Sequence, residues 1–464
     1  MIKPARIDVD GARITRVEVL PSNDVGASPD VAAPGEKPSA SQRDEHDLGE
    51  RLITPAFVNA HTHLALAFLR GVETTRVRRN LVEDLYFAYE SRLSADDIRA
   101  FARMGAYESL LSGVGLVWDH YYGGSAVADA LRDTGLAGVV APTLQDLAGP
   151  DRDGAEAALD ATLRIADDAR YRAASVFAAL GPHATDTVSP GLFRRIAELS
   201  EQRGLPVHLH VAQSYDELAR VEAREGRSPL ALLAREGILS RAPRVVMAHG
   251  LFASIPDLRA LDPSRHTLVY CPSSQLQFGF PAPVSRWSEL GVSWVVATDC
   301  ASSNDSMNVQ KELRFCAGAA SAEITGSLEY ESFLSSGEVG HARDTWHERT
   351  ERAKAFGRHV NSEQLLARVW SEAGALHPEV ETGVIARGAL ANLAVWNTDH
   401  PAFWPGQDLL RALAMSDISQ ALHGMYVAGR AVGEPGHLVE SVVGSDAYRE
   451  ARREADGRLA ALMR

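Results

Sequence analysis

The sequence predicts an α/β protein, namely a (β/α)8 TIM-like barrel with a small β-sandwich domain built from both chain ends. Eight apolar runs typical of β-strands recur between residues 52 and 298, and amphipathic stretches typical of helices separate them. Polar residues stand at the downstream ends of these runs, and short alternating strands occur near both ends of the chain. Apolar strands that alternate with helices indicate a parallel sheet covered on both faces, and eight such units favour closure into a barrel.

The N-terminal part predicts a β-hairpin followed by a loop. Apolar and polar residues alternate in Arg6–Val9 and Ile14–Val19, and Asp10-Gly11 between them is a dipeptide typical of hairpin turns. Residues 23–50 are rich in Pro, Ser, Ala, Asp and Gly, a composition that indicates a mobile loop.

The central part supplies the eight strands of the predicted barrel. The amphipathic segments between them include three long ones, Ser94–Ser112, Pro190–Arg203 and Asn304–Ala320. The strand-like runs are 52–60, 114–118, 136–141, 175–180, 206–211, 244–248, 267–271 and 293–298. Their alternation with helices is the pattern of βα units in a parallel sheet.

The C-terminal part returns to short strands. Residues 321–362 form a polar insertion, which we expect to be a solvated loop or helical excursion over a barrel face, with a lid as the alternative. Strand patterning then resumes at 383–385, 393–396, 425–427 and 431–432, and a charged segment with leucines at helical spacing ends the chain. The predicted domains are a composite β domain (1–53 with 382–436), the barrel (54–381) and a helical tail (437–464).

Composition and charge restrict the function. Of the 464 residues, 45% are hydrophobic and 23% are charged, which is typical of a soluble globular protein. The net charge of −14 argues against nucleic-acid binding but leaves a small neutral or cationic substrate open. The 3 cysteines are too few and too scattered for a disulfide framework, so a reducing cytoplasm is expected. We expect no membrane partner, because the sequence has neither an apolar signal core nor a long apolar run.

Polar side chains at the strand ends are the candidate functional residues, because the C-terminal rim of a barrel carries its chemistry. Histidines are prominent among them. The set comprises His61, His63, Asp119, His120, Tyr121, Tyr122, Gln145, Asp146, His183, His208, His210, Gln213, His249, Ser273, Ser274 and Asp299.

The pair His61 and His63 predicts a metal site. Residues i and i+2 of a strand project to the same side, so both imidazoles point the same way. The fifth strand ends in a second pair, His208 and His210, of which only one need bind while the other faces the barrel wall. With Asp299 after the eighth strand, three imidazoles and a carboxylate suit Zn²⁺, or Fe²⁺ at similar geometry.

The chain resembles the amidohydrolase superfamily, in particular the metal-dependent aminohydrolase and chlorohydrolase branch that includes cytosine deaminases and triazine hydrolases. The resemblance covers nearly the whole chain. Its motifs are Pro55–Leu64 (PAFVNAHTHL), His208–His210 (HLH), Ala248–Gly250 (AHG), Cys271–Ser274 (CPSS), Ala297–Asp299 (ATD) and the closing segment from Thr382 to Trp396.

The resemblance implies a ligand set and a role for each site residue. It implies a metal held by His61, His63, His210 and Asp299, with one Zn²⁺ per chain and Fe²⁺ as the alternative. It further implies that Asp299 deprotonates the attacking water and that His249 orients that water or the tetrahedral intermediate. A homo-oligomer, namely a dimer, is also expected from the family.

The distribution of lysines excludes one form of binuclear site. Some relatives bridge two metals with a carboxylated lysine at a barrel strand. This chain has 4 lysines, and none lies between residues 38 and 310. A mononuclear site is therefore expected, while a carboxylate or cysteine bridge stays formally open.

The sequence departs from the deaminase pattern at Gln213, where the family has a glutamate three residues after the metal-binding histidine. A neutral amide forms hydrogen bonds but cannot carry a proton to a leaving group. Three interpretations follow: Asp299 and His249 do all the proton transfer, the leaving group needs little protonation, as chloride would, or the protein binds metal and ligand without turnover. Glu217 could replace the missing carboxylate, although acidic residues on surface helices are usually solvated.

The predicted activity is that of a mononuclear metal-dependent hydrolase, most simply an aminohydrolase that releases ammonia or an amine from a nitrogen heterocycle. The alternatives are a hydrolytic dehalogenase and an inactive relative that keeps the metal site. The predicted catalytic residues are Asp299, His249 and Gln213. The predicted substrate contacts of the small-molecule pocket are His183, Gln145, Tyr121 and Ser273.

Overall fold

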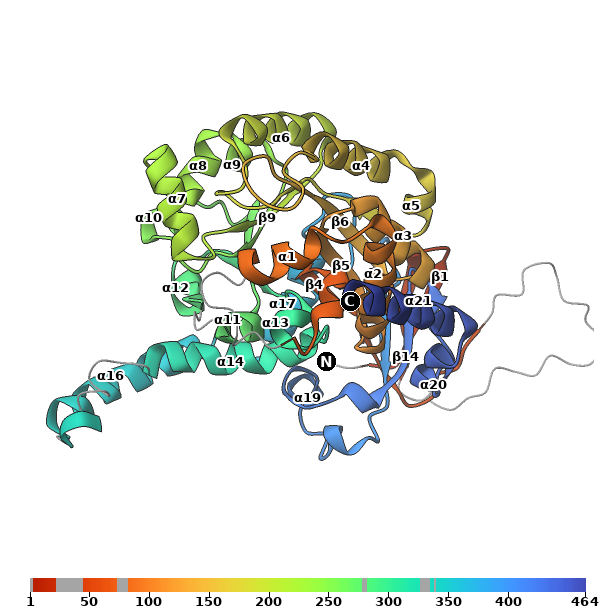
Figure 1. Ribbon diagram of the computed structural model, residues 1–464. Coiled ribbons are helices and arrows are strands. Elements are labelled where there is room, and N and C mark those ends of the chain that lie inside the picture. The colour runs from red at the N-terminus through yellow and green to blue at the C-terminus, as the bar shows by residue number, and fades with distance from the viewer. Residues whose placement is uncertain (1–2, 22–44, 73–81, 278–281, 326–333, 338) are drawn as a thin grey trace, which may run out of the picture.

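The computed structural model describes the whole chain except residues 1–2, 22–44, 73–81, 278–281, 326–333 and 338. A barrel of parallel strands occupies its centre, and helices surround it (Figure 1). Its strands are β4 (Phe57–Thr62), β5 (Val114–Tyr121), β6 (Ala137–Leu144), β7 (Val176–Ala178), β9 (Val207–Val211), β10 (Val245–His249), β11 (His266–Tyr270) and β12 (Ser293–Val296). All eight predicted runs are confirmed as strands.

Two parallel sheets form the barrel and meet at two seams. One sheet has the order β4-β5-β6-β7, with the short β8 (Gly181–Pro182) on β6, and the other has the order β12-β11-β10-β9. At one seam, the backbone N–H of Asp299 donates to the carbonyl of His61 at 3.1 Å. At the other seam, the N–H of His208 donates to the carbonyl of Leu180 at 2.9 Å. These seams bring the ends of the first, fifth and eighth strands to one rim.

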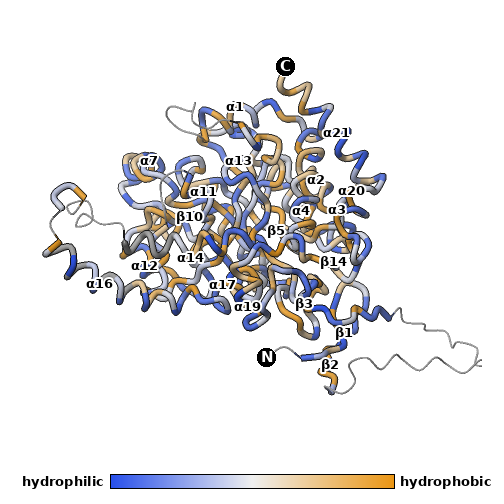
Figure 2. The backbone as a smooth tube through the Cα atoms, turned by 90° about the horizontal axis from the view of Figure 1, so that it is seen from below, coloured by the Kyte–Doolittle hydropathy of each residue, from blue (hydrophilic) through white to orange (hydrophobic). Residues whose placement is uncertain are grey.

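Helices cover the outside of the barrel. The longest early helix, α2 (Ala95–Leu111), begins at Ser94, whose side chain accepts from the N–H of Asp97 in a capping box. Figure 2 shows hydrophobic segments gathered around the central strands and hydrophilic positions on the peripheral helices. The further helices are α3 (Gly124–Thr134), α4 (Ala155–Asp167), α5 (Ala169–Ala173), α6 (Pro190–Arg203), α7 (Tyr215–Glu225), α8 (Pro229–Arg235), α9 (Ile238–Arg241), α10 (Ile255–Arg259), α11 (Pro272–Gln277), α12 (Val284–Glu289), α13 (Ala301–Asn304), α14 (Val309–Thr325), α17 (Ser362–Val369), α18 (Ser371–Gly374) and α19 (Leu409–Met415).

A small antiparallel sheet joins both ends of the chain, as predicted. Its order is β15-β14-β13-β3, from β15 (Arg430–Ala431), β14 (Leu422–Val427), β13 (Leu393–Trp396) and β3 (Leu52–Pro55). The predicted run 52–60 is therefore divided, because the chain leaves this sheet at Pro55 and enters the barrel at Phe57. The indole N–H of Trp396 fixes the crossing by donating to Thr54 Oγ1 at 2.9 Å.

The predicted strand at 383–385 is wrong, since these residues form a bend. Gly383 has a φ of +70°, and a Cβ there would lie 2.2 Å from the carbonyl oxygen of Trp370. An extended strand with a side chain does not fit this close approach.

The N-terminal hairpin is confirmed as β1 (Ala5–Asp10) and β2 (Arg13–Val19). Ile14 is buried, and its N–H donates to the carbonyl of Ala389 at 3.0 Å, so the hairpin attaches to the C-terminal part of the chain. Most of the predicted loop 23–50 lies outside the described residues.

The insertion 321–362 contains the end of α14 and the helix α16 (Gly340–Phe356). The α16 helix extends away from the barrel instead of crossing one of its faces (Figure 1). The predicted helical tail is confirmed as α20 (Leu438–Val443) and α21 (Asp446–Leu462). Arg458 of α21 forms an ion pair with Asp97 of α2 at 3.1 Å. Within the described ranges, no helix is long and apolar enough to cross a bilayer.

Candidate metal centre and active site

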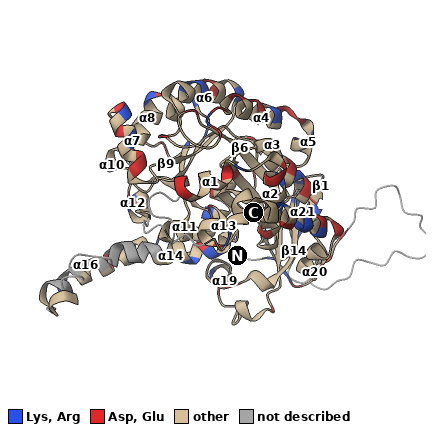
Figure 3. Ribbon diagram, in the orientation of Figure 1, with Lys and Arg blue, Asp and Glu red and all other residues tan. Residues whose placement is uncertain are grey.

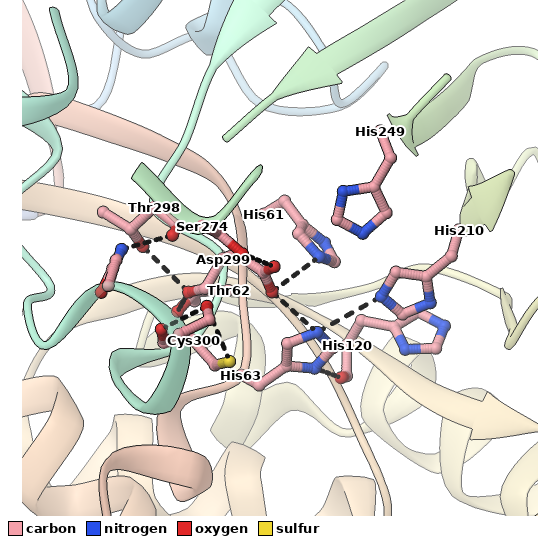
Figure 4. A network of polar contacts seen from close by, with 12 residues as sticks. His61, Thr62, His63, His120, His210, His249, Ser274, Thr298, Asp299 and Cys300 are labelled. Atoms are coloured by element: carbon pink, nitrogen blue, oxygen red, sulfur yellow. Dashed lines mark hydrogen bonds and ion pairs between the residues drawn. The ribbon is translucent and has the colours of Figure 1, made fainter. Parts of the chain in front are cut away.

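Three imidazoles converge at the rim where β4 and β9 end. His61 is in β4, His63 follows it directly, and His210 is in β9. One ligand atom from each histidine lies within 4.8 Å of the others, and Nε2 of His210 is 3.3 Å from Nε2 of His63. Figure 4 shows the three rings pointing toward one another beside Asp299. This is the geometry of a metal-ligand set.

The second ring nitrogen of each histidine is already engaged. Nδ1 of His63 contacts the carbonyl of His120, and Nδ1 of His210 is 3.0 Å from the carbonyl of His183. Because a carbonyl only accepts, both Nδ1 atoms carry the proton and both Nε2 atoms present lone pairs. Nδ1 of His61 lies 2.9 Å from Nε2 of His208. Of the second histidine pair, His208 is therefore engaged with His61 and is not one of the three clustered ligands.

The carboxylate of Asp299 lies beside the three imidazoles. Its Oδ1 is 3.6 Å from Nε2 of His61 and 3.4 Å from Nε2 of His63, and its Oδ2 accepts from the Ser274 hydroxyl at 2.7 Å. Asp299 has a φ of +62°, which is an uncommon backbone conformation for a residue with a side chain. Such strain concentrates at functional sites, where the surrounding structure holds it in place.

The donor set fits a divalent cation. The lone pairs of His63 and His210 face each other at 3.3 Å, and Nε2 of His61 is buried without a hydrogen-bond partner. Burial lowers the pKa of His61, whereas the two histidines beside Asp299 hold the pKa of that carboxyl well below its usual range against burial. Burial also lowers the pKa of His210, whereas Asp299 raises that of His63 against the effect of burial. Neutral imidazoles at His61 and His210 beside an ionised Asp299 are protonation states that bind a metal.

His249 follows the sixth barrel strand and faces the same centre (Figure 4). Its ring lies 5.4 Å from the ring of His210, and its φ of +76° is again in the left-handed region. The side-chain amide of Gln275 lies 3.0 Å from Nδ1 of His249 and orients the ring, so that its Nε2 is left for the centre. Only the nearness of Gln275 to the CPSS motif could have indicated this contact.

Gln213 lies where the chain leaves β9, and Glu217 holds its backbone. Glu217 is fully buried, which corrects the expectation that it is solvated. Its Oε1 accepts from the N–H of Ala212 at 3.1 Å and from the hydroxyl of Thr185, and its Oε2 accepts from the N–H of Gln213 at 2.8 Å. All of these bonds run to the loop and to Thr185, so Glu217 serves as a support beneath Gln213.

A cavity of about 500 Å³ opens beside this centre. The metal-ligand histidines His63 and His210, together with Asp299, His249 and Gln213, contribute to its wall. Of the predicted substrate contacts, His183 and Tyr121 line it as well. No described residue of the insertion 321–362 lines the cavity, so the described part of that segment is not a lid.

Two predicted substrate contacts do not reach the cavity wall. Gln145 is fully buried behind Tyr122, with its side-chain amide 3.3 Å from the Tyr122 hydroxyl. Ser273 turns away, and its N–H donates to Glu312 at 2.9 Å. The reason is the start of α11 at Pro272, because the helical turn points Ser274 and Gln275 at the centre in place of Ser273.

Two further cavity residues had no predicted role, and one of them was outside the predicted set. Glu90 closes the short helix α1 (Phe87–Glu90), which follows the π-helix η3 (Val82–Tyr86) after β4. Burial raises the pKa of Glu90 to about 7, although His63 and the Tyr121 hydroxyl oppose the shift. His120 lies among His183, His208 and His210, and its Nε2 is buried without a partner. His120 was predicted only as one of the polar residues at the strand ends, and nothing in the sequence marked Glu90.

Comparison with known proteins agrees with this geometry. The model of the "Amidohydrolase family" matches residues 52–432, which is most of the chain. The chain belongs to the amidohydrolase family. A 5-methylthioadenosine/S-adenosylhomocysteine deaminase of Haloarcula marismortui is 28% identical over 417 residues, which cover 89% of this chain and 86% of the relative.

Two solved structures share the fold of this amidohydrolase. An adenosine deaminase from Xanthomonas campestris with bound zinc has a TM-score of 0.75 at 20% identity and covers 98% of this chain and 94% of its own. An atrazine chlorohydrolase from Arthrobacter aurescens, complexed with zinc, has a TM-score of 0.73 at 20% identity and covers 100% of this chain and 96% of its own. The predicted barrel with its small sheet from both chain ends is thus confirmed.

Proposed function

We propose that this amidohydrolase is a mononuclear metal-dependent aminohydrolase that removes ammonia from the adenine ring of an adenosine analogue. The convergence of His61, His63, His210 and Asp299 at one end of the cavity is the observation that carries the proposal. The relative from Haloarcula is a deaminase of methylthioadenosine and S-adenosylhomocysteine, which favours an adenine nucleoside over other heterocycles. Zinc is the proposed metal, with iron as the alternative.

The four ligands would hold the cation, which supplies Lewis-acid chemistry that makes water a nucleophile near neutral pH. Asp299 is the proposed general base, because Ser274 fixes its Oδ2 and leaves its Oδ1 facing the centre. The proton then leaves on the departing amine. His249, which Gln275 orients, forms a hydrogen bond to the oxygen of the attacking water or, after the attack, to the same oxygen in the tetrahedral intermediate.

Gln213 is the proposed hydrogen-bond partner of the purine ring. A carboxamide can donate to or accept from a ring nitrogen, but it carries no proton between groups. The attacking water supplies two protons, one for the ring nitrogen and one for the departing amine, and both therefore pass through Asp299 and His249. His183 and Tyr121 are the proposed side walls, since both line the cavity next to the centre.

A hydrolytic dehalogenase is the second candidate, and Gln213 is the observation that favours it. Chloride leaves as an anion and needs no proton, so a neutral amide at this position does not greatly lower the rate of such a reaction. The third interpretation, a protein that binds metal and ligand without turnover, predicts no product at all.

A substrate screen with two readouts separates the three functions. The purified protein, loaded with Zn²⁺, is incubated with adenosine, methylthioadenosine, guanine, aminated pterins and pyrimidines, and chlorinated triazines, while ammonia and chloride are measured in parallel. Ammonia from the adenine nucleosides supports the proposal, and chloride from a triazine with no ammonia supports the dehalogenase. Chelation should abolish turnover and added Zn²⁺ should restore it, whereas turnover that survives chelation contradicts the metal-dependent mechanism.

A further inference from the structure

Glu312 is a buried carboxylate that the proposed mechanism does not use. It lies on α14 and is 1% exposed. Figure 3 shows most charged positions on the peripheral helices, such as α4, α6 and α7, where water solvates them. Glu312 is not one of the described residues that line the cavity, so its function there does not consist in contacting a ligand. A carboxylate buried to this extent needs a partner within the protein.

That partner is the first turn of α11. Pro272, the first residue of this helix, has no N–H, so Ser273 supplies the first backbone donor of the helix. The Ser273 N–H donates to Oε2 of Glu312 at 2.9 Å. The donors in the first turn of a helix have no acceptor within the helix itself, and Glu312 provides one from outside. This bond joins the start of α11 to α14.

The first turn of α14 is itself anchored. The side-chain amide of Gln310 donates to the carbonyl of Leu413 at 3.0 Å and to that of Ser416 at 2.8 Å, in α19 and directly after it. Gln310 and Leu313, which precede and follow Glu312 in this turn, are buried. The carboxylate of Glu312 is therefore presented to α11 from a helix that is held in place.

The next two residues of α11 contact the reacting groups. The Ser274 hydroxyl donates to Oδ2 of Asp299 at 2.7 Å, and the side-chain amide of Gln275 lies 3.0 Å from Nδ1 of His249. A helix of 6 residues has few hydrogen bonds of its own, so its rotation depends on the groups that hold its ends. A shift of α11 would change both contacts at once.

We propose that Glu312 is a positioning residue of the active site. It fixes the rotation of α11, and α11 in turn orients the carboxylate of Asp299 and the ring of His249. The inference rests on the proposed function for the part that these two groups play in turnover. The orientation of Asp299 also concerns the metal centre, so a measurement of metal binding tests the inference without a substrate.

The affinity for Zn²⁺ is measured by competition with a chelating dye in the wild type and three variants. Glu312→Ala removes the acceptor of the Ser273 N–H, whereas Glu312→Gln keeps an accepting oxygen on a side chain of the same length. Glu236→Ala is the matched control, because it removes a buried carboxylate elsewhere. Glu236 follows the outer helix α8 and lies 3.1 Å from Arg194.

Glu312→Ala should weaken the affinity for Zn²⁺ about tenfold, the lower end of the range typical for outer partners of metal ligands. Glu312→Gln and Glu236→Ala should both stay within about threefold of the wild type. If Glu312→Ala does not fold, Glu312→Asp, which keeps the charge on a shorter side chain, should lose more than about threefold. An affinity equal to that of the wild type in the Ala or Asp variant, or an equal loss in Glu236→Ala, overturns the positioning role.

A double-mutant cycle tests the path through α11. The value of kcat for ammonia release from adenosine is measured for Glu312→Ala alone and in a background that carries Ser274→Ala and Gln275→Ala. Glu312→Ala should lower kcat about tenfold in the wild type and by less than about threefold in that background, because the contacts through which it acts are already gone. Equal factors in the two backgrounds overturn the path. No ammonia from the wild type contradicts the proposed function, and the affinity measurements then decide the inference by themselves.

Discussion

The backbone N–H of Gln213 donates a 2.8 Å hydrogen bond to the carboxylate of Glu217, one turn along the following helix. The chain thus keeps a buried carboxylate close to the position where the family has a catalytic glutamate. That carboxylate is engaged in holding the loop, and it is Gln213 that lines the cavity. The relationship between these two residues defines the first two predictions.

Replacing the support should loosen the Gln213 loop. In Glu217→Gln, one of the two accepting oxygens becomes an NH2 donor, so the N–H of either Ala212 or Gln213 loses its acceptor. We expect a loss of about 1–3 kcal/mol in the free energy of unfolding, because a buried donor loses its partner. Urea denaturation measures it. An unchanged midpoint would mean that water or another group replaces the carboxylate at no cost.

The same substitution should change how stability depends on pH. Burial, with the nearby charge of Asp186, raises the pKa of Glu217 from 4.5 to about 7 in the folded protein. Between these two values the folded state binds more protons than the unfolded state, so this contribution to stability is present below about pH 4.5 and is lost as the pH rises to 7. The destabilisation caused by Glu217→Gln should therefore be larger at pH 5 than at pH 7.5. A constant difference would place the pKa of Glu217 near its ordinary value.

Gln213→Glu restores the residue that the deaminase pattern contains. If proton delivery to the amine limits turnover, the rate of ammonia release should rise about tenfold or more, in line with general acid–base catalysis. The chloride-releasing reaction, if present, should not benefit. The comparison is made on kcat, with Gln213→Met as the control for side-chain volume. A decrease in both rates would show that the neutral amide is required by the substrate.

Asp299→Asn tests the proposed general base. The amide cannot accept the proton of the attacking water, so we expect kcat to fall by roughly a factor of 1,000 or more. Metal content is determined alongside, because a lost ligand and a lost base both reduce activity. Ser274→Ala, which frees Oδ2 of Asp299 and leaves the carboxylate in place, should reduce kcat by a much smaller factor. Turnover that persists in Asp299→Asn would refute the mechanism.

His208 should determine how tightly the centre holds its cation, although it is not a ligand. Nε2 of His208 lies 2.9 Å from Nδ1 of His61 and orients that ring. His208→Leu should weaken metal affinity by roughly 10- to 100-fold, the range typical for outer partners of metal ligands. His208→Gln retains an acceptor and should recover part of the loss. Competition with a chelating dye reads the affinity directly, and equal affinity in the two variants would argue against this role.

The dimer, the cytoplasmic location and the exact domain boundaries remain predictions of the sequence. Sizing of the purified protein by light scattering addresses the first of these.

Much of the fold followed from local pattern. The barrel strands are mostly apolar and nearly all of their residues are buried, so periodicity and length were enough to predict all eight. The error at Gly383 has a different origin. The carbonyl of Trp370 imposes this conformation, and Trp370 lies outside the segment whose residues alternate like a strand. Local propensity carries no information on contacts of this kind.

The sequence by itself determined that His61 and His63 project together, because the two-residue period of a strand is a local property. It also determined the polar rim, since residues at strand ends of a barrel meet at one end. Only the tertiary structure decided that Ser274 and Gln275, and not Ser273, face the centre, that Glu217 is buried beneath Gln213, and that Glu90 reaches the cavity. These outcomes depend on the rotation of a helix, the closure of the barrel and the path of a loop, which are set by contacts between segments far apart in the chain.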